Sequence, residues 1–286
     1  AGIVMMTAAT GFFITMNTLI KLVGPSYDPI QVTFIRNLVA SFVIIPFIVR
    51  AGGMRVLKTG RPWLHAARSI GGVVSTVLYF YAFVRLPLAD VMVISQAVPL
   101  FVAMLAALIL KEQVGRRRWA AISVGFIGVL VTLDPSGAIR PEAMVAVAAT
   151  ALWAMTVLVI RSLGSTESPY AVAFYYMVSG TLLTALVMPW VWRTPSPDVL
   201  AMLVIAGVLG AFGQILMTYA LKVAEASVVS PFNYTSILWG MMFDLLVWGM
   251  APGTATLIGA TIITSAGLYL LHREGLRRKS RPPAGS

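Results

Sequence analysis

The sequence predicts an all-α membrane protein with ten transmembrane helices, arranged as two inverted repeats of five helices, with both termini in the cytoplasm. Three observations support this fold class. The composition is 59% hydrophobic and only 11% charged over 286 residues, whereas about a quarter of the residues of a soluble domain are charged. Ten apolar runs are long enough to cross a bilayer. The second half of the chain also repeats the pattern of the first.

Each apolar run has about 17 to 25 residues, the length that a helix needs to cross the hydrocarbon layer. No long polar block separates the runs, so we expect one membrane domain with the lipid bilayer as its surroundings and no soluble domain. The runs lie near residues 3–23, 29–50, 64–85, 89–110, 117–134, 141–162, 169–192, 198–221, 226–248 and 254–272.

An internal repeat divides these runs into two sets of five. The segment AATGFFITMNTLIKLVG at 8–24 aligns with AATALWAMTVLVIRSLG at 148–164, an offset of 140 residues, and the same offset carries Pro29 onto Pro169. An odd number of spans per repeat makes the second copy enter the membrane from the opposite side, as in alternating-access transporters. The predicted units are the repeats 1–139 and 140–274, followed by a basic cytoplasmic tail at 275–286.

The basic residues predict the orientation, because Lys and Arg gather in cytoplasmic loops. With the N-terminus inside, sixteen of the 21 basic residues fall on the cytoplasmic side, with Arg68 counted among them. Four fall outside, and Arg36 lies within a span. The net charge of +11 is thus explained by orientation, and we expect no nucleic acid partner.

The polar residues exclude most enzyme chemistry. The chain has no cysteine, and its two histidines, His65 and His272, lie far apart. It contains no HExxH motif and no phosphate-binding GxxxxGK[ST] loop. We therefore expect no enzyme, no metal and no cofactor.

The fourth run, from Asp90 to Lys111, contains a predicted helix break. Pro99 lacks an N–H and leaves the carbonyl of Ser95 without a helical partner, next to Gln96. Such a break persists in hydrocarbon only where protein covers it or where it lines a wet cavity. Both alternatives remain open, and the second predicts a substrate site.

The ninth run repeats this polar pattern, and further site candidates come from the aligned spans. Pro231, Asn233 and Tyr234 lie at the equivalent depth of the ninth run, and Gln214 aligns with Thr76. We expect Ser95, Gln96, Gln214 and Asn233 to bind the polar part of a substrate, with helix packing as the alternative. Trp153, Tyr234 and Trp239 are the candidates for packing its side chain, although aromatic residues near span ends more often anchor the protein at the interface.

Arg36 lies about seven residues into the second run, where an unpaired charge costs at least ~2.5 kcal/mol. It could neutralise a substrate carboxylate, form a gating ion pair with Asp90 or Asp244, or extend to the interface. Asp244 is also a candidate for proton coupling.

The two five-span copies, with LPLADVMVISQAVPLFVAMLAALILKEQVGRRRWAAISVGFIGVLV at 86–131 in the first, resemble the EamA-type transporters of the drug/metabolite transporter superfamily. The pattern is similar to bacterial exporters of aromatic amino acids. The resemblance implies a multi-pass protein of the bacterial inner membrane, with a central cavity lined by spans 1, 3, 4, 6, 8 and 9. It also implies export of amino acids with aromatic or hydrophobic side chains by a monomer or weak homodimer. The alternatives are exchange or uptake of another metabolite, such as a nucleotide-like cofactor, and a passive channel.

Overall fold

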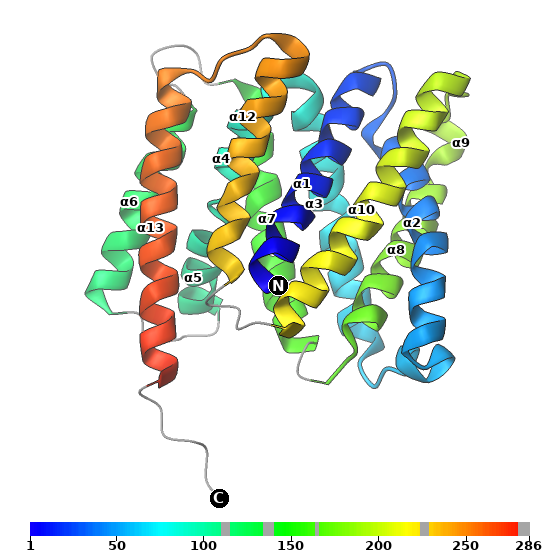
Figure 1. The fold of residues 1–286 in the computed structure, drawn as a ribbon, viewed down its shortest axis with the longest axis horizontal. Helices are drawn as coiled ribbons and strands as arrows, with labels where there is room; N and C mark the ends of the chain where they lie inside the picture. The colour runs from blue at the N-terminus through cyan, green and yellow to red at the C-terminus, as the bar shows by residue number, and fades with distance from the viewer. Residues whose placement is uncertain (110–114, 134–139, 164–165, 224–228, 280–286) are drawn as a thin grey trace, which may run out of the picture.

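The computed structural model describes residues 1–109, 115–133, 140–163, 166–223 and 229–279, and these residues contain helices and no strand (Figure 1). The predicted all-helical class is therefore confirmed for this part of the chain. The helices are α1 (Gly2–Val23), α2 (Pro29–Ala51), η1 (Gly53–Leu57), α3 (Pro62–Arg85), α4 (Leu88–Ser95), α5 (Val98–Ile109), α6 (Arg116–Thr132), α7 (Pro141–Leu163), α8 (Pro169–Ala185), α9 (Met188–Val191), α10 (Pro197–Val223), η2 (Ser230–Tyr234), α12 (Thr235–Trp248) and α13 (Thr254–Lys279).

Within the described residues, seven helical segments are long and apolar enough to cross a membrane. They are Gly2–Val23, Pro29–Ala51, Pro62–Arg85, Leu88–Leu105, Pro141–Ile160, Pro197–Met217 and Thr254–His272. The other predicted runs hold shorter helices: α6, α8 followed by α9, and η2 followed by α12. The predicted tail at 275–286 lies partly in α13, which continues to Lys279, and partly at 280–286, outside the described residues.

The starts of α2 and α8 repeat the offset of 140 residues. The Asp28 side chain accepts a hydrogen bond from the Ile30 amide at the first turn of α2. The Ser168 side chain accepts one from the Tyr170 amide at the first turn of α8. A proline follows each cap at a position where its missing N–H costs nothing. The same local signal therefore starts an equivalent helix in each half.

The helices form one bundle whose two ends are named here from Figure 1. The upper end is where α1 finishes at Val23, and the lower end is where α2 finishes at Ala51. The most extensive packing joins α1 to α10 and α3 to α7, and α6 packs along α13. Because α7 is the repeat counterpart of α1 and α10 that of α3, the first two pairings are equivalent to each other. Large apolar side chains such as Phe42, Leu182 and Leu246 are exposed on the bundle, as lipid contact requires.

The α6–α13 contact depends on a glycine, which gives a prediction for stability. A Cβ at Gly259 would collide with Thr132 Oγ1 and lie 2.8 Å from the Gly128 carbonyl oxygen. We expect Gly259→Ala to lower the free energy of unfolding by about 1–3 kcal/mol because the core is overpacked. Thermal unfolding in detergent measures this. Gly253→Ala is the control, since its nearest neighbour, Thr256 Oγ1, would be 3.7 Å away; equal losses in the two variants would contradict the prediction.

Candidate functional site

The fourth span is interrupted beside the predicted polar pair. Helix α4 ends at Ser95 and α5 begins at Val98. The Gln96 side chain donates hydrogen bonds from Nε2 to the Asn233 carbonyl oxygen, at 3.2 Å, and to Ser236 Oγ, at 2.6 Å. Ser95 Oγ instead donates to the Met92 carbonyl within its own helix, at 2.7 Å. Gln96 therefore links the two halves of the chain, whereas Ser95 acts locally.

The predicted ninth run also departs from a regular α-helix. The 3-10 turn η2 contains Pro231 and continues directly into α12. Thr235 Oγ1, at the start of α12, lies 2.9 Å from Thr10 Oγ1 of α1. Asn233 presents its backbone carbonyl, not its side-chain amide, to Gln96. The structure thus places Gln96 beside Asn233, with α1 next to them.

Three other candidates lie in different surroundings. The buried Tyr234 hydroxyl packs against Gly267 of α13 and has no hydrogen-bond partner among the described residues. The Trp239 ring packs against Gly11 of α1 and lines a groove of about 590 Å³ with Leu209. Gln214 is half-buried on α10. The placement of Tyr234 against α13 does not support its predicted contact with a shared substrate, because alignment gives the depth of a residue and not the direction of its side chain.

A second polar region, not anticipated from the sequence, surrounds Arg68 in the interior. The Arg68 guanidinium lies over the Tyr176 ring, 4.2 Å from its centroid, and over the Trp153 ring, at 5.2 Å. The Tyr176 hydroxyl is 2.8 Å from Thr76 Oγ1 and interacts electrostatically with both Arg68 and Arg36. We call Arg36, Arg68, Trp153 and Tyr176 the arginine–aromatic cluster. It joins α2, α3, α7 and α8, and only its Trp153 and Arg36 were site candidates.

The burial of Arg68 corrects its assignment to the cytoplasmic loops. Its exposed fraction is 4%, and it lies within α3, with the faces of Trp153 and Tyr176 supplying its contacts. Arginine near the start of a span is ordinarily read as an interface residue. The two rings that contact Arg68 belong to α7 and α8. The residues close to Arg68 in the sequence therefore do not predict this contact.

In this structure Arg36 is not paired with Asp90 or Asp244, the two acidic residues considered as its gating partners. Asp244 instead forms an ion pair with Lys21, whose Nζ lies 3.1 Å from Oδ1, and it accepts the Ala89 amide at 2.8 Å. Asp90 accepts a hydrogen bond from Thr256 Oγ1 at 2.6 Å. Arg36 Nη1 donates to Asn37 Oδ1 at 3.3 Å. The reason is packing: α12, which carries Asp244, packs on α1 and α4.

The Lys21–Asp244 pair lies at the upper end of the bundle. Lys21 Nζ also lies 4.4 Å from the centroid of the Trp248 ring. Asp244 and Ala89 line a neighbouring cavity of about 540 Å³ together with Asp90 and Arg140. We call the contact of Lys21, Ala89 and Asp244 the upper contact. It joins α1 and α4 of the first half to α12 of the second.

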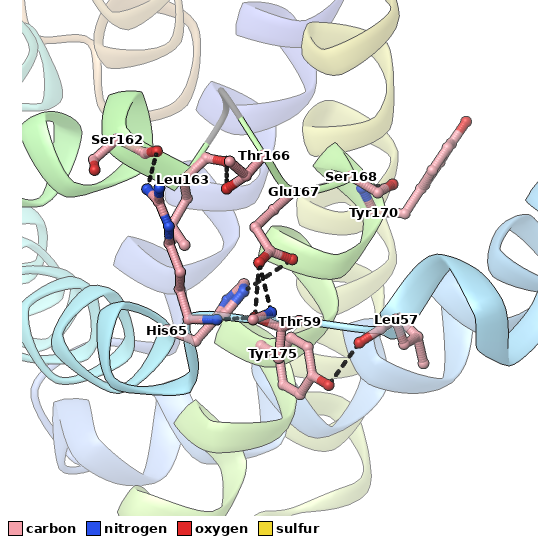
Figure 2. A network of polar contacts seen from close by, with 12 residues as sticks. Leu57, Thr59, His65, Ser162, Leu163, Thr166, Glu167, Ser168, Tyr170 and Tyr175 are labelled. Atoms are coloured by element: carbon pink, nitrogen blue, oxygen red, sulfur yellow. Dashed lines mark hydrogen bonds and ion pairs between the residues drawn. The ribbon is translucent and has the colours of Figure 1, made fainter.

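A corresponding network joins the two halves at the lower end (Figure 2). Glu167 Oε1 accepts hydrogen bonds from Thr59 Oγ1, at 2.8 Å, and from the Gly60 amide, at 3.2 Å. His65 Nε2 lies 3.7 Å from Glu167 Oε2, and its ring packs on Tyr175, with centroids 4.6 Å apart. We call this network the lower contact. Its residues lie in loops and near helix ends, where the hydrophobic pattern of the sequence does not predict which residues contact each other.

Comparison with known proteins agrees with this architecture. A family model described as the EamA-like transporter family matches residues 1–134 and again 140–272. The S-adenosylmethionine uptake transporter of Rickettsia prowazekii is 29% identical over 255 residues, which are 89% of this chain and 86% of that protein. The riboflavin transporter of Rhizobium johnstonii is 29% identical, covering 83% and 79% of the two chains. The pseudopaline exporter of Pseudomonas aeruginosa is 26% identical, covering 94% and 95%.

A solved crystal structure shares the fold. It superposes with a TM-score of 0.65 over 98% of this chain and 99% of its own, at 16% sequence identity.

No metal site is formed by the described residues. Among them, no group of three or more His, Asp or Glu side chains is arranged to hold a metal ion.

Proposed function

The chain belongs to the EamA-like transporter family and is a multi-pass protein of the bacterial inner membrane, and from this premise we propose that it is a secondary transporter of a small nucleotide-like cofactor. The relatives named for S-adenosylmethionine and riboflavin support this substrate class. They favour it over the expected export of amino acids, which none of the relatives described above is named for. One of these relatives is named for uptake and another for export, so the proposal does not include a direction of transport.

The proposed architecture is ten spans in two inverted repeats, with both termini and the lower end in the cytoplasm. The double match to the family model supports the two repeats. The equivalent helix caps at Asp28 and Ser168 and the equivalent packing pairs α1–α10 and α3–α7 support their relation. An inverted pair of repeats can exchange conformations, and this exchange exposes a central site to each side in turn.

The observation that carries the transport mechanism is the contact between the two interrupted spans. Gln96, at the break between α4 and α5, donates to the Asn233 carbonyl and to Ser236, at the junction of η2 and α12. Backbone without helical partners is tolerated at membrane depth where it is covered by protein or lines a cavity. In the proposal the two breaks are the points at which the repeats separate, and the upper and lower contacts are the gates on either side.

Flux into proteoliposomes tests the proposed function. The purified protein would be reconstituted, and uptake of labelled S-adenosylmethionine, riboflavin and tryptophan compared with uptake by empty liposomes. We expect saturable uptake of at least one of the two cofactors, reduced by an excess of the unlabelled compound. Saturable flux of tryptophan with neither cofactor entering would reject the substrate class, and flux that never saturates would favour a channel.

Gln96→Ala is expected to reduce saturable flux about tenfold or more, because it removes both hydrogen bonds that connect the two breaks. Each hydrogen bond between membrane helices contributes only ~0.6 kcal/mol on average, so the folded yield should stay near that of the wild type. Flux and yield are measured on the same preparation. Ser95→Ala is the matched control, since Ser95 bonds only within its own helix; normal flux in Gln96→Ala would remove this residue from the mechanism.

A further inference from the structure

We propose that the arginine–aromatic cluster binds an oxyanion, a carboxylate or a phosphate, on the substrate. This inference rests on the proposed function and deepens it by assigning a site and a charge to the substrate. Arg68 is the principal binding residue, Arg36 adds the second positive charge, and Trp153 and Tyr176 hold the Arg68 guanidinium in place.

The cluster contains buried N–H groups that have no acceptor in the part of the chain that the structure describes. Among the described residues, nothing accepts a hydrogen bond from Nε or Nη1 of Arg68 or from Nε of Arg36. The exposed fractions of Arg68 and Arg36 are 4% and 8%. Asn37 Nδ2, beside Arg36, is also buried without an acceptor. A guanidinium has five donors in a fixed plane and no acceptor, so the unpaired groups call for an acceptor from outside the protein.

The charge of the cluster is likewise unbalanced by the described side chains. Asp244 is bound to Lys21, Asp90 to Thr256 and Glu167 to the loop at Thr59. Neither ion pair of the described chain includes Arg36 or Arg68. Positive charge at membrane depth is costly unless it is paired or hydrated. An entering oxyanion would remove this imbalance, whereas a cation would increase it.

The packing holds Arg68 in an orientation suited to such a ligand. Its guanidinium lies over the rings of Tyr176 and Trp153, and its unpaired Nε and Nη1 groups remain for charge-assisted hydrogen bonds with an oxyanion. Gly72 permits this arrangement, because a Cβ there would collide with Arg68 Nη1 and lie 3.0 Å from Tyr176. The offset of 140 residues also places Arg36 and Tyr176 at equivalent positions of the two repeats. The site therefore lies where the repeats meet.

Simple anions test the site without any transport measurement. The unfolding temperature of the purified protein would be measured with acetate, with phosphate and with chloride at equal ionic strength. We expect at least one oxyanion to raise the unfolding temperature above its value in chloride. Arg68→Gln should abolish this rise, and the exposed control Arg55→Gln should keep it. No rise in the wild type, or a rise that persists in Arg68→Gln, would overturn the proposal.

Matched ligands test whether the same site selects the substrate. S-adenosylmethionine would be compared with its decarboxylated analogue, and flavin mononucleotide with riboflavin, in competition for binding to the wild type. We expect the member that carries the oxyanion, the carboxylate of S-adenosylmethionine or the phosphate of flavin mononucleotide, to bind about 10- to 100-fold more tightly in at least one pair, as the loss of one charge-assisted hydrogen-bond pair implies. Arg68→Gln should remove that preference and Arg68→Lys should restore part of it.

The two proposals can fail separately. If the cofactors are transported and neither pair is discriminated, the site assignment is wrong and the proposed function stands. If an oxyanion stabilises the wild type through Arg68 and no cofactor is transported, the site stands and the proposed function is wrong. The difference in affinity between the two members of each ligand pair is measured on the wild-type protein. This measurement alone tests the site assignment if the Arg68 variants do not fold.

Discussion

Lys21→Met is expected to lower the free energy of unfolding by about 3–5 kcal/mol, because it leaves the Asp244 carboxylate buried without its counter-charge. The two side chains are 8% and 2% exposed, and Nζ lies 3.1 Å from Oδ1. The remaining hydrogen bond from the Ala89 amide to Asp244 satisfies only part of the charge. The substitution also removes the contact of the ammonium with Trp248. The upper contact should therefore be the site most sensitive to the loss of one charge.

A double-mutant cycle measures this effect. Lys21→Met, Asp244→Leu and the double variant would be compared by unfolding in detergent. We expect the double variant to be more stable than the less stable single variant, since it contains no unpaired charge. Arg85→Met is the control for charge alone, as Arg85 is exposed at the end of α3. Additive losses in the double variant would show that the pair is not coupled.

Glu167→Ala is expected to open the lower end. It removes the acceptor of Thr59 Oγ1 and of the Gly60 amide, and because neither donor residue is fully buried, each lost hydrogen bond costs about 0.5–1.5 kcal/mol. A bias of ~1.4 kcal/mol toward the open form raises its population about tenfold. Because the chain has no cysteine, Ser69→Cys provides a single reporter. The exposed fraction of Ser69 is 1%, so a thiol there should react only when the lower end opens.

The measurement is the rate at which this thiol reacts with a membrane-impermeant maleimide applied to the lower end. We expect the rate in Glu167→Ala to be about ten times that in the parent Ser69→Cys protein. Thr166→Ala is the matched control, because the Thr166 hydroxyl bonds only the nearby Leu163 carbonyl. An unchanged rate in Glu167→Ala would mean that Glu167 does not hold the lower end closed.

The helices were predictable because their signals are local. Apolar length predicts spans such as α1 and α3, and the caps at Asp28 and Ser168 are single-residue signals next to prolines. The depth of Gln96 and Asn233 followed from the repeat, and the structure places these two residues in contact. The repeat predicts the depth of a residue in the membrane, because equivalent spans have similar lengths and equivalent residues therefore lie at a similar distance from the span ends.

The directions and partners of the side chains were not predictable in the same way. Tyr234 directly follows Asn233 in the chain, yet its hydroxyl packs against Gly267 of α13. Lys21 and Asp244 are 223 residues apart, and Arg68 finds its aromatic partners on α7 and α8. These pairings depend on how the two halves pack together. Neither hydropathy nor the repeat offset encodes that packing.

Locking each end in turn tests the central claim, which is that the two ends open alternately around a site inside the bundle. One protein would carry Thr59→Cys with Glu167→Cys at the lower contact, and another Lys21→Cys with Asp244→Cys at the upper contact. Each pair would be joined by a short cleavable bifunctional maleimide and tested for flux in proteoliposomes. We predict that either link alone stops flux and that cleaving it restores the rate of the unlinked variant. Continued flux with either end linked would contradict alternating access.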